Sequence, residues 1–296
     1  MFEKFLKDNA VGFKKAYDFG SKHGYKAPGI VDYYVEIDSA SLLESILQSA
    51  RREGLKTVAV GDGSNLLIRD SFNGVLINWK RSDCNIFTDG SSRVTLKVSS
   101  GMSKSDLMDY CVEHGLSGLE FWAGIPGFVG GGVAMNAGAY DKDMKDTVKS
   151  IEIVTVDGIK NIDAKDLKLS YRKLHIPESS VITSVAFFLK KRTPQEIKAK
   201  VDEYIADREK KHPLDYPSCG SVFKNPTSER GAWSLINDLG LSGFKLGGAM
   251  VSTKHTNFII NAGGASSSDV LGLISLIKEK VKNKFDIELE EELRVI

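Results

Sequence analysis

The sequence lacks three features that would assign a functional class directly: a long hydrophobic run, an excess of one charge and a cysteine framework. No apolar stretch approaches the roughly 18 residues of a membrane-spanning helix, and charges interrupt the N-terminal segment where a signal peptide would be apolar. The 40 basic and 39 acidic residues nearly cancel, so no strong field attracts nucleic acid or anionic membranes. We therefore expect a cytoplasmic protein with small-molecule partners, no nucleic acid and no membrane insertion.

The three cysteines, Cys84, Cys111 and Cys219, are widely spaced and cannot all pair with one another. Neither they nor the histidines show metal-ligand spacing, so we expect a reducing compartment and no metal. The chain also lacks internal repeats and low-complexity tracts. Its 296 residues and 42% hydrophobic content are enough for a sizeable core in two or more domains.

Hydrophobic periodicity predicts a mixed chain of helices and strands in three parts, 1–80, 81–192 and 193–296. Strands are expected over 32–37, 57–60, 75–79, 94–98, 151–156, 181–189 and 287–296. Helices are expected over 41–52, 103–114, 193–211 and about 270–281. We expect Ser103 to cap the second of these helices.

The most unusual part of the chain is the segment 124–140, which has six glycines in seventeen residues. Glycine allows a ligand to lie directly against backbone amides, so the segment is a candidate anion or cofactor cradle. The three consecutive glycines at 130–132 are hard to explain by packing, and we expect buried loop backbone there. A second glycine turn at 61–65 follows an apolar run, as phosphate-binding turns do, although such clusters most often mark tight turns.

Several polar residues could carry chemistry. Ser221 lies in the polar patch 218–226 without a nearby His and Asp, which argues against a hydrolytic nucleophile, but its hydroxyl could protonate a carbanion-like centre. The fork of Arg172 suits a carboxylate, although a surface salt bridge is the commoner role. Arg208 and Lys211 are three apart on a predicted helix and could clasp a diphosphate, although a solvated helix face is the usual role of such pairs. The spacing of Glu292 and of His255 gives no functional signal.

Five ordered motifs nevertheless make the chain resemble a known family over nearly its whole length. They are Val60–Leu67, Gly124–Tyr140, Tyr171–Arg172, Gly220–Pro226 and Leu289–Ile296. On these motifs the chain resembles the UDP-N-acetylenolpyruvoylglucosamine reductase family, in its shorter type. These flavoenzymes make UDP-N-acetylmuramate for bacterial cell walls.

The resemblance implies an α+β fold with a two-lobed FAD-binding domain of the vanillyl-alcohol-oxidase type and a C-terminal α/β substrate-binding domain. It implies bound FAD, NADPH as hydride donor and UDP-N-acetylglucosamine enolpyruvate as substrate. The catalytic residues that it implies are Arg172, Ser221 and Glu292. The candidate cofactor-binding residues are Gly61, Asp62, Gly63, Ser64, Asn65, Leu66, Gly124, Ile125, Pro126, Gly127, Val129, Gly130, Gly131, Asn136, Ala137, Gly138 and Ala139. The candidate substrate-binding residues are Arg208, Lys211, Asn225 and His255.

The implied chemistry explains why a serine could act as a proton donor. Hydride addition to the vinyl carbon of the substrate leaves negative charge that spreads into its carboxylate. Arg172 would stabilise this charge, Glu292 in its protonated form would donate a hydrogen bond to it, and Ser221 would protonate the neighbouring carbon. Two alternatives stay open: a related FAD-dependent oxidase that uses oxygen, and a noncatalytic flavin- or nucleotide-binding protein. The oligomeric state is not predicted.

Overall fold

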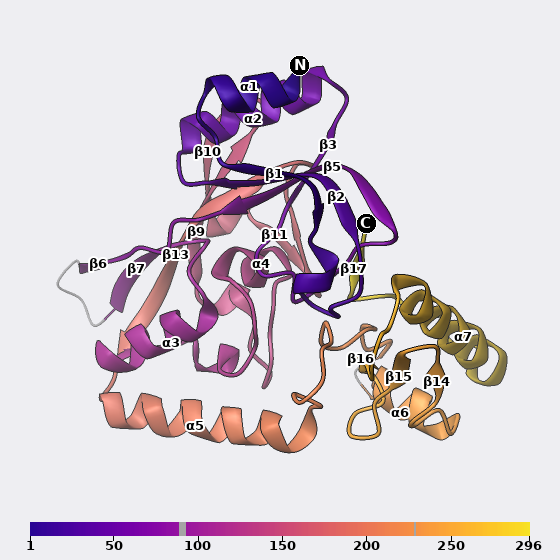
Figure 1. The fold of residues 1–296 in the computed structure, drawn as a ribbon. Helices are drawn as coiled ribbons and strands as arrows, with labels where there is room; N and C mark the ends of the chain where they lie inside the picture. The colour runs from indigo at the N-terminus through magenta and orange to yellow at the C-terminus, as the bar shows by residue number, and fades with distance from the viewer. Residues whose placement is uncertain (89–92, 228) are drawn as a thin grey trace. The chain divides into compact units, whose positions relative to one another are not determined.

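The computed structural model describes residues 1–88, 93–227 and 229–296 (Figure 1). The chain divides into two compact units, and each is built from several stretches of sequence. The first unit comprises Met1–Lys15, Tyr33–Gly61 and Asn73–Asp207, and the second comprises Ala16–Asp32, Asp62–Phe72 and Arg208–Ile296. The division into 1–80, 81–192 and 193–296 stays a prediction.

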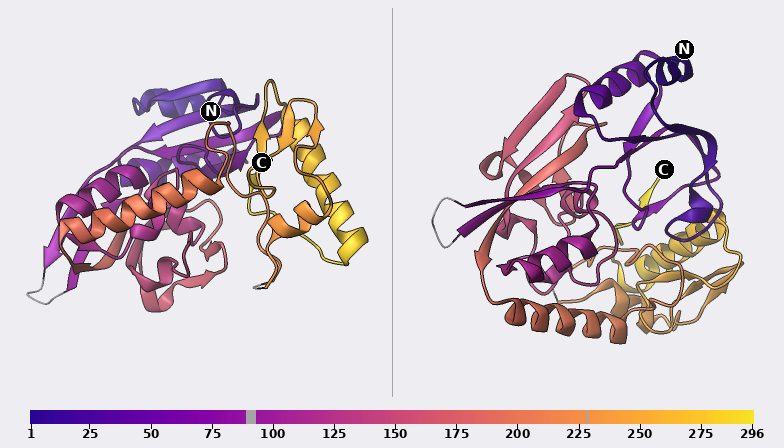
Figure 2. Two further views of the ribbon diagram at one scale, coloured as in Figure 1. Left: turned by 90° about the horizontal axis from the view of Figure 1, so that it is seen from below. Right: turned by 60° about the vertical axis from the view of Figure 1, so that its left-hand side comes forward.

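The larger sheet of the first unit has the strand order β10–β9–β13–β7–β6, and β8 also pairs with β13. Its strands are β6 (Cys84–Thr88), β7 (Arg93–Ser99), β8 (Leu116–Ser117), β9 (Val148–Thr155), β10 (Gly158–Asp163) and β13 (Val181–Lys191). All its pairs are antiparallel, and alternate residues such as Leu96, Val98 and Val185 are buried. Helices α3 (Lys104–Glu113) and α5 (Pro194–Lys211) add side chains to the same core. Figure 2 shows the ribbon of both helices in two further views.

A smaller core lies in the N-terminal part of the first unit. Helix α1 (Phe2–Asp8) and helix α2 (Ala40–Arg52) pack there beside a four-stranded sheet with the order β1–β2–β5–β3. Its strands are β1 (Phe13–Asp18), β2 (Ile30–Ile37), β3 (Lys56–Ala59) and β5 (Ser71–Trp79). Helix α2 begins where the Ser39 hydroxyl accepts a hydrogen bond from Leu42 N, and it buries one face at helical spacing.

The second unit has its own core around a three-stranded antiparallel sheet, two helices and a short parallel pair of strands. The sheet contains β14 (Lys245–Leu246), β15 (Ala249–Val251) and β16 (Ile259–Asn261), and the helices are α6 (Ala232–Asp238) and α7 (Ser267–Phe285). The parallel pair is β4 (Leu66–Leu67) with β17 (Arg294–Val295). Ser266 and Asp269 form a capping box that starts α7.

The predicted helices are confirmed within a few residues at each end, including the Ser103 cap of α3 and the apolar stripe of α7. Two predictions are wrong. The strand expected over 287–296 is reduced to β17, because the residues before it bond singly to other segments instead of forming a ladder. The glycines at 130–132 are not loop backbone but lie inside the short helix α4 (Val129–Ala134).

Among residues 1–88, 93–227 and 229–296, no helix combines the length and the apolar composition that crossing a bilayer requires.

Candidate active site

Packing explains two of the three consecutive glycines of α4. This corrects our expectation that packing does not account for the glycines at 130–132. A Cβ on Gly132 would lie 2.7 Å from the Trp122 ring, and a Cβ on Gly130 would lie 2.9 Å from Ser100 Cβ. A Cβ on Gly131 would meet no heavy atom within 4 Å, apart from its own helix backbone and chain neighbours. Among the three consecutive glycines, Gly131 is therefore the one that faces open space.

Asn136, another predicted cofactor-binding residue, joins the glycine segment to the rest of the first unit. It is buried and takes the left-handed backbone conformation, with φ of 39°. Its Nδ2 donates to Ser170 O at 3.0 Å, and its Oδ1 accepts from Met144 N at 3.2 Å. The side chain thus fixes the end of the glycine segment against the hairpin that carries Arg172.

Arg172 occupies the tight turn between β11 (Lys168–Ser170) and β12 (Lys173–His175). Its φ of 59° lies in the left-handed region, a conformation that a bulky residue adopts rarely and that often marks functional turns. Its guanidinium lies 4.9 Å from the centre of the Tyr171 ring. Below the turn, the buried side chain of Leu174 contributes to the core of the first unit.

Two side chains donate hydrogen bonds to backbone carbonyls of the turn at 61–65. In the first unit, Asn78 Nδ2 donates to Gly61 O at 2.9 Å. In the second unit, His23 Nδ1 donates to Asp62 O at 2.9 Å. The Asp62 carboxylate bends back onto its own turn and accepts from Ser64 N at 3.0 Å. One amide that the resemblance assigns to the flavin diphosphate therefore already has a negatively charged partner.

In the second unit, the backbone next to Ser221 is hydrogen-bonded to the backbone of Glu292. Val222 O, in the residue after Ser221, accepts from Glu292 N at 2.8 Å. On the other side of Glu292, its carbonyl accepts from Asn65 Nδ2 at 3.1 Å. The predicted proton donor, the predicted acid and part of the predicted flavin turn thus belong to one hydrogen-bonded frame.

The four predicted substrate-binding residues have different environments. Arg208 and Lys211 lie in the last turn of α5, the former half-buried and the latter exposed. Asn225 is exposed, but its Oδ1 accepts from Ala232 N at 3.2 Å and so begins α6.

His255 is half-buried beside the rings of His212 and Phe258. Burial lowers the pKa of its imidazole, because the charged form loses hydration. Its Nδ1 accepts a hydrogen bond of 3.3 Å from Asn257 N, so the proton of the neutral ring is on Nε2.

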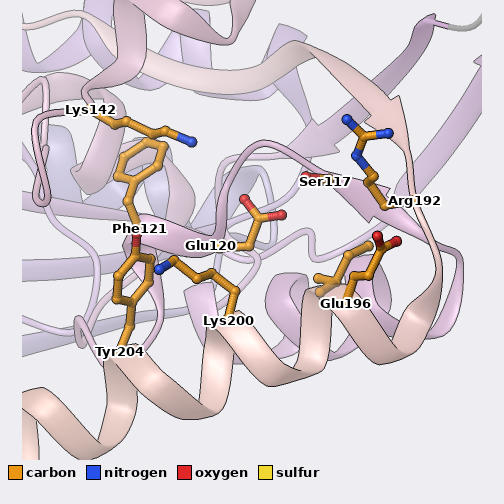
Figure 3. A pocket seen from close by; sticks show the side chains of 9 residues that line it. Ser117, Glu120, Phe121, Lys142, Arg192, Glu196, Lys200 and Tyr204 are labelled. Atoms are coloured by element: carbon orange, nitrogen blue, oxygen red, sulfur yellow. The ribbon is translucent and has the colours of Figure 1, made fainter.

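A separate cavity of about 270 Å³ in the first unit contains none of the predicted site residues (Figure 3). Its wall residues are Ser117, Glu120, Phe121, Lys142, Arg192, Glu196, Ile197, Lys200 and Tyr204. Three of its charged side chains have partners: Glu120 accepts from Gly118 N, Glu196 accepts from Thr193, and Lys200 pairs with Glu203. The cavity is therefore not the predicted flavin site.

Sequence reasoning missed Asn257, which lies in the turn at 256–257 of the second unit and hydrogen-bonds to the residues after Ser221. An asparagine in a polar stretch reads as a turn residue, so the sequence carried no signal for this role. Among the described residues, no group of three or more His, Cys, Asp or Glu side chains could hold a metal ion.

Comparison with known proteins shows the family to which the chain belongs. Residues 212–296 match the family model "UDP-N-acetylenolpyruvoylglucosamine reductase, C-terminal domain", and residues 31–161 match an FAD binding domain. The UDP-N-acetylenolpyruvoylglucosamine reductase of Syntrophomonas wolfei is 37% identical over 275 residues, covering 92% of this chain and 91% of the relative. The same-named protein of Listeria monocytogenes is 37% identical over 280 residues, covering 93% and 92%. The chain belongs to the UDP-N-acetylenolpyruvoylglucosamine reductase family.

A solved structure agrees with this assignment. The UDP-N-acetylenolpyruvylglucosamine reductase of Thermus caldophilus superimposes with a TM-score of 0.78 at 28% identity, covering 96% of this chain and 98% of that one. The chain is thus an FAD-dependent oxidoreductase with an FAD-binding domain and the C-terminal domain of the reductase family. The predicted family, fold class and FAD cofactor are confirmed.

Proposed function

We propose that the chain reduces UDP-N-acetylglucosamine enolpyruvate to UDP-N-acetylmuramate for peptidoglycan synthesis, with NADPH as the source of the hydride. The names of its relatives and the FAD-binding domain support this reaction. The observation that carries the residue assignment is the hydrogen bond from Glu292 N to Val222 O, in the residue after Ser221. Pure binding of a nucleotide gives no reason to hold a hydroxyl and a carboxyl in one frame.

The residues of the first unit fit a flavin at the predicted segment. Gly131 leaves open space where any larger residue would project a side chain, whereas its neighbours are closed by packing. Gly131 would let the cofactor approach the backbone, and Asn136 would keep the segment in place. When bound, FAD supplies the hydride-transfer chemistry that no side chain can provide.

Three side chains have proposed roles on the substrate. Arg172 stabilises the negative charge that develops in the enolpyruvyl carboxylate, for which its planar fork is suited. Glu292 in its protonated form donates a hydrogen bond to the same charge. Ser221 gives its hydroxyl proton to the carbon next to the carboxylate, a centre basic enough to take a proton from an alcohol.

Four further residues are proposed to bind the substrate: Arg208, Lys211, Asn225 and His255. Arg208 and Lys211 are three residues apart at the C-terminal end of α5, so their side chains lie on neighbouring positions of one helix face. Two cations so placed suit a diphosphate. Asn225 uses its amide oxygen at the start of α6, and its amide nitrogen is a donor group for the substrate.

An anaerobic two-step experiment tests the proposal. NADPH should bleach the yellow protein, and UDP-N-acetylglucosamine enolpyruvate should restore the colour. In Ser221→Ala, bleaching should keep its normal rate, whereas recovery should slow by about a thousandfold because the proton donor is lost. Colour recovery at the wild-type rate in Ser221→Ala would show that Ser221 is not the proton donor. Fast aerobic recovery without the sugar nucleotide would favour an oxidase, and no bleaching would favour a noncatalytic binding protein.

A further inference from the structure

Asn257 makes three hydrogen bonds to the backbone of Val222 and Phe223, the two residues after Ser221. It is buried, with 4% of its surface exposed. Its Oδ1 accepts from Phe223 N at 3.0 Å, and its Nδ2 donates to Phe223 O at 2.8 Å. Its own carbonyl accepts from Val222 N at 2.8 Å. One residue thus holds both backbone groups of Phe223 and the amide of Val222.

Such a clamp is needed because Ser221–Phe223 belongs to no helix or ladder of strands. The segment forms only isolated bridges, Ser221 with Phe258 and Phe223 with Glu291. A buried peptide group without a partner costs free energy comparable to a lost hydrogen bond, so irregular buried backbone needs side chains that both donate and accept. An asparagine amide meets both needs at once.

The clamp also determines where Glu292 lies relative to Ser221. Asn257 binds the amide side of the Val222 residue, and Glu292 N binds its carbonyl. The Val222 residue is therefore fixed at both ends, with the hydroxyl-bearing residue before it and the carboxyl-bearing residue across from it. A shift of the Val222 backbone would move Ser221 and Glu292 relative to each other.

We propose that Asn257 is a positioning residue of the reductase reaction, which acts by holding Ser221 at the orientation from which its hydroxyl protonates the substrate. This inference rests on the proposed function of Ser221. It assigns Asn257 no contact with substrate or cofactor. Its effect is confined to the half of the reaction that consumes the sugar nucleotide, because bleaching by NADPH requires no proton from Ser221.

The experiment uses the FAD-loaded protein and the variants Asn257→Ala and Asn257→Asp. The alanine removes both side-chain bonds, and the aspartate keeps the acceptor but loses the Nδ2 donor. Both should bleach with NADPH at the wild-type rate, whereas colour recovery by UDP-N-acetylglucosamine enolpyruvate should slow by about ten- to a hundredfold, the usual effect of misplacing a reacting group. Asn257→Gln cannot reproduce the geometry and should also be slow.

Asn261 provides a matched control. It lies in the same unit and also clamps backbone by its side chain, donating to Tyr25 O at 2.9 Å and accepting from Gly263 N at 3.0 Å. Asn261→Ala should lower the melting temperature to a similar extent but leave both half-reactions unchanged. If Asn261→Ala slows colour recovery as much as Asn257→Ala does, the effect is general loosening of the unit and the positioning role is refuted.

A double-mutant cycle separates this inference from the proposed function. If Asn257 acts through Ser221, adding Asn257→Ala to Ser221→Ala should slow colour recovery no further, because the group to be positioned is already absent. Additive losses would overturn the positioning role and leave the role of Ser221 intact. A Ser221→Ala variant with wild-type recovery would refute the proton donor itself.

Discussion

Two adjacent glycines of α4, Gly131 and Gly132, look alike in the sequence but should respond in opposite ways to the same substitution. In the absence of cofactor, Gly132→Ala places a methyl group 2.7 Å from the Trp122 ring, which is fully buried. Carbon atoms pack at about 3.5–4.0 Å, so the ring or the helix must move by about 1 Å. Overpacking of this kind costs about 1–3 kcal/mol, and we expect that loss in the unfolding free energy of the apoprotein.

Gly131→Ala should have the opposite effect on the apoprotein. Its methyl group meets no heavy atom within 4 Å beyond its own helix and neighbours, and its φ is not positive. Replacing glycine by alanine within a helix stabilises by about 0.5–1 kcal/mol, so the apoprotein should be unchanged or slightly more stable. If the flavin lies against this backbone, the same methyl group should weaken FAD binding at least about tenfold, or about 1.4 kcal/mol.

Urea unfolding of the apoproteins and fluorescence titration with FAD measure the two quantities separately. We expect Gly132→Ala to lose stability but Gly131→Ala to lose FAD affinity. FAD affinity of Gly131→Ala equal to wild type would refute the placement of the cofactor at Gly131. A Gly132→Ala apoprotein as stable as wild type would show that the Trp122 contact relaxes without cost.

Two further predictions concern charge. Asp62→Asn keeps an acceptor for Ser64 N but removes a negative charge from the turn predicted to bind the flavin diphosphate. FAD binding, measured by titration, should therefore tighten by about 1 kcal/mol. Unchanged or weaker binding would argue against a diphosphate at this turn. The pKa of His255 lies below the ordinary 6.5, so the unfolded chain binds a proton at this residue more strongly than the folded chain does. The contribution of His255 to stability is therefore fully present above about pH 6.5 and is lost as the pH falls toward the lowered pKa. Urea unfolding from pH 7.5 to pH 5 should show a smaller loss of stability in His255→Gln than in wild type, and identical slopes would exclude this residue as the cause.

The sequence predicted the helices well because their signals are local. The α3 helix carries its cap at Ser103, and α7 carries its apolar stripe along one face. The strand expected over 287–296 failed for a non-local reason: alternation predicts an extended chain but not a partner, and most of this segment pairs singly with residues such as Val222. Extended backbone without a ladder cannot be distinguished from a strand by periodicity alone.

The family could be predicted from the sequence, but the arrangement of the candidate site residues could not. The ordered motifs identified the family, which the comparisons confirm. The reason for the glycines of α4 was hidden, since it depends on Trp122 and Ser100, which approach only in the folded chain. The use of the Asp62 carboxylate inside its own turn was equally hidden.

Side-chain amides of asparagine bind the backbone at three segments that carry predicted site residues. Asn136 holds the glycine segment to the Arg172 hairpin, Asn65 binds the carbonyl of Glu292, and Asn257 clamps the residues after Ser221. The physical reason is common to all three: such segments have peptide donors and acceptors that no helix or ladder satisfies, and an amide offers one donor and one acceptor group on a short, neutral side chain. A carboxylate of the same shape lacks the donor, so these positions should not tolerate aspartate even where the local volume is unchanged.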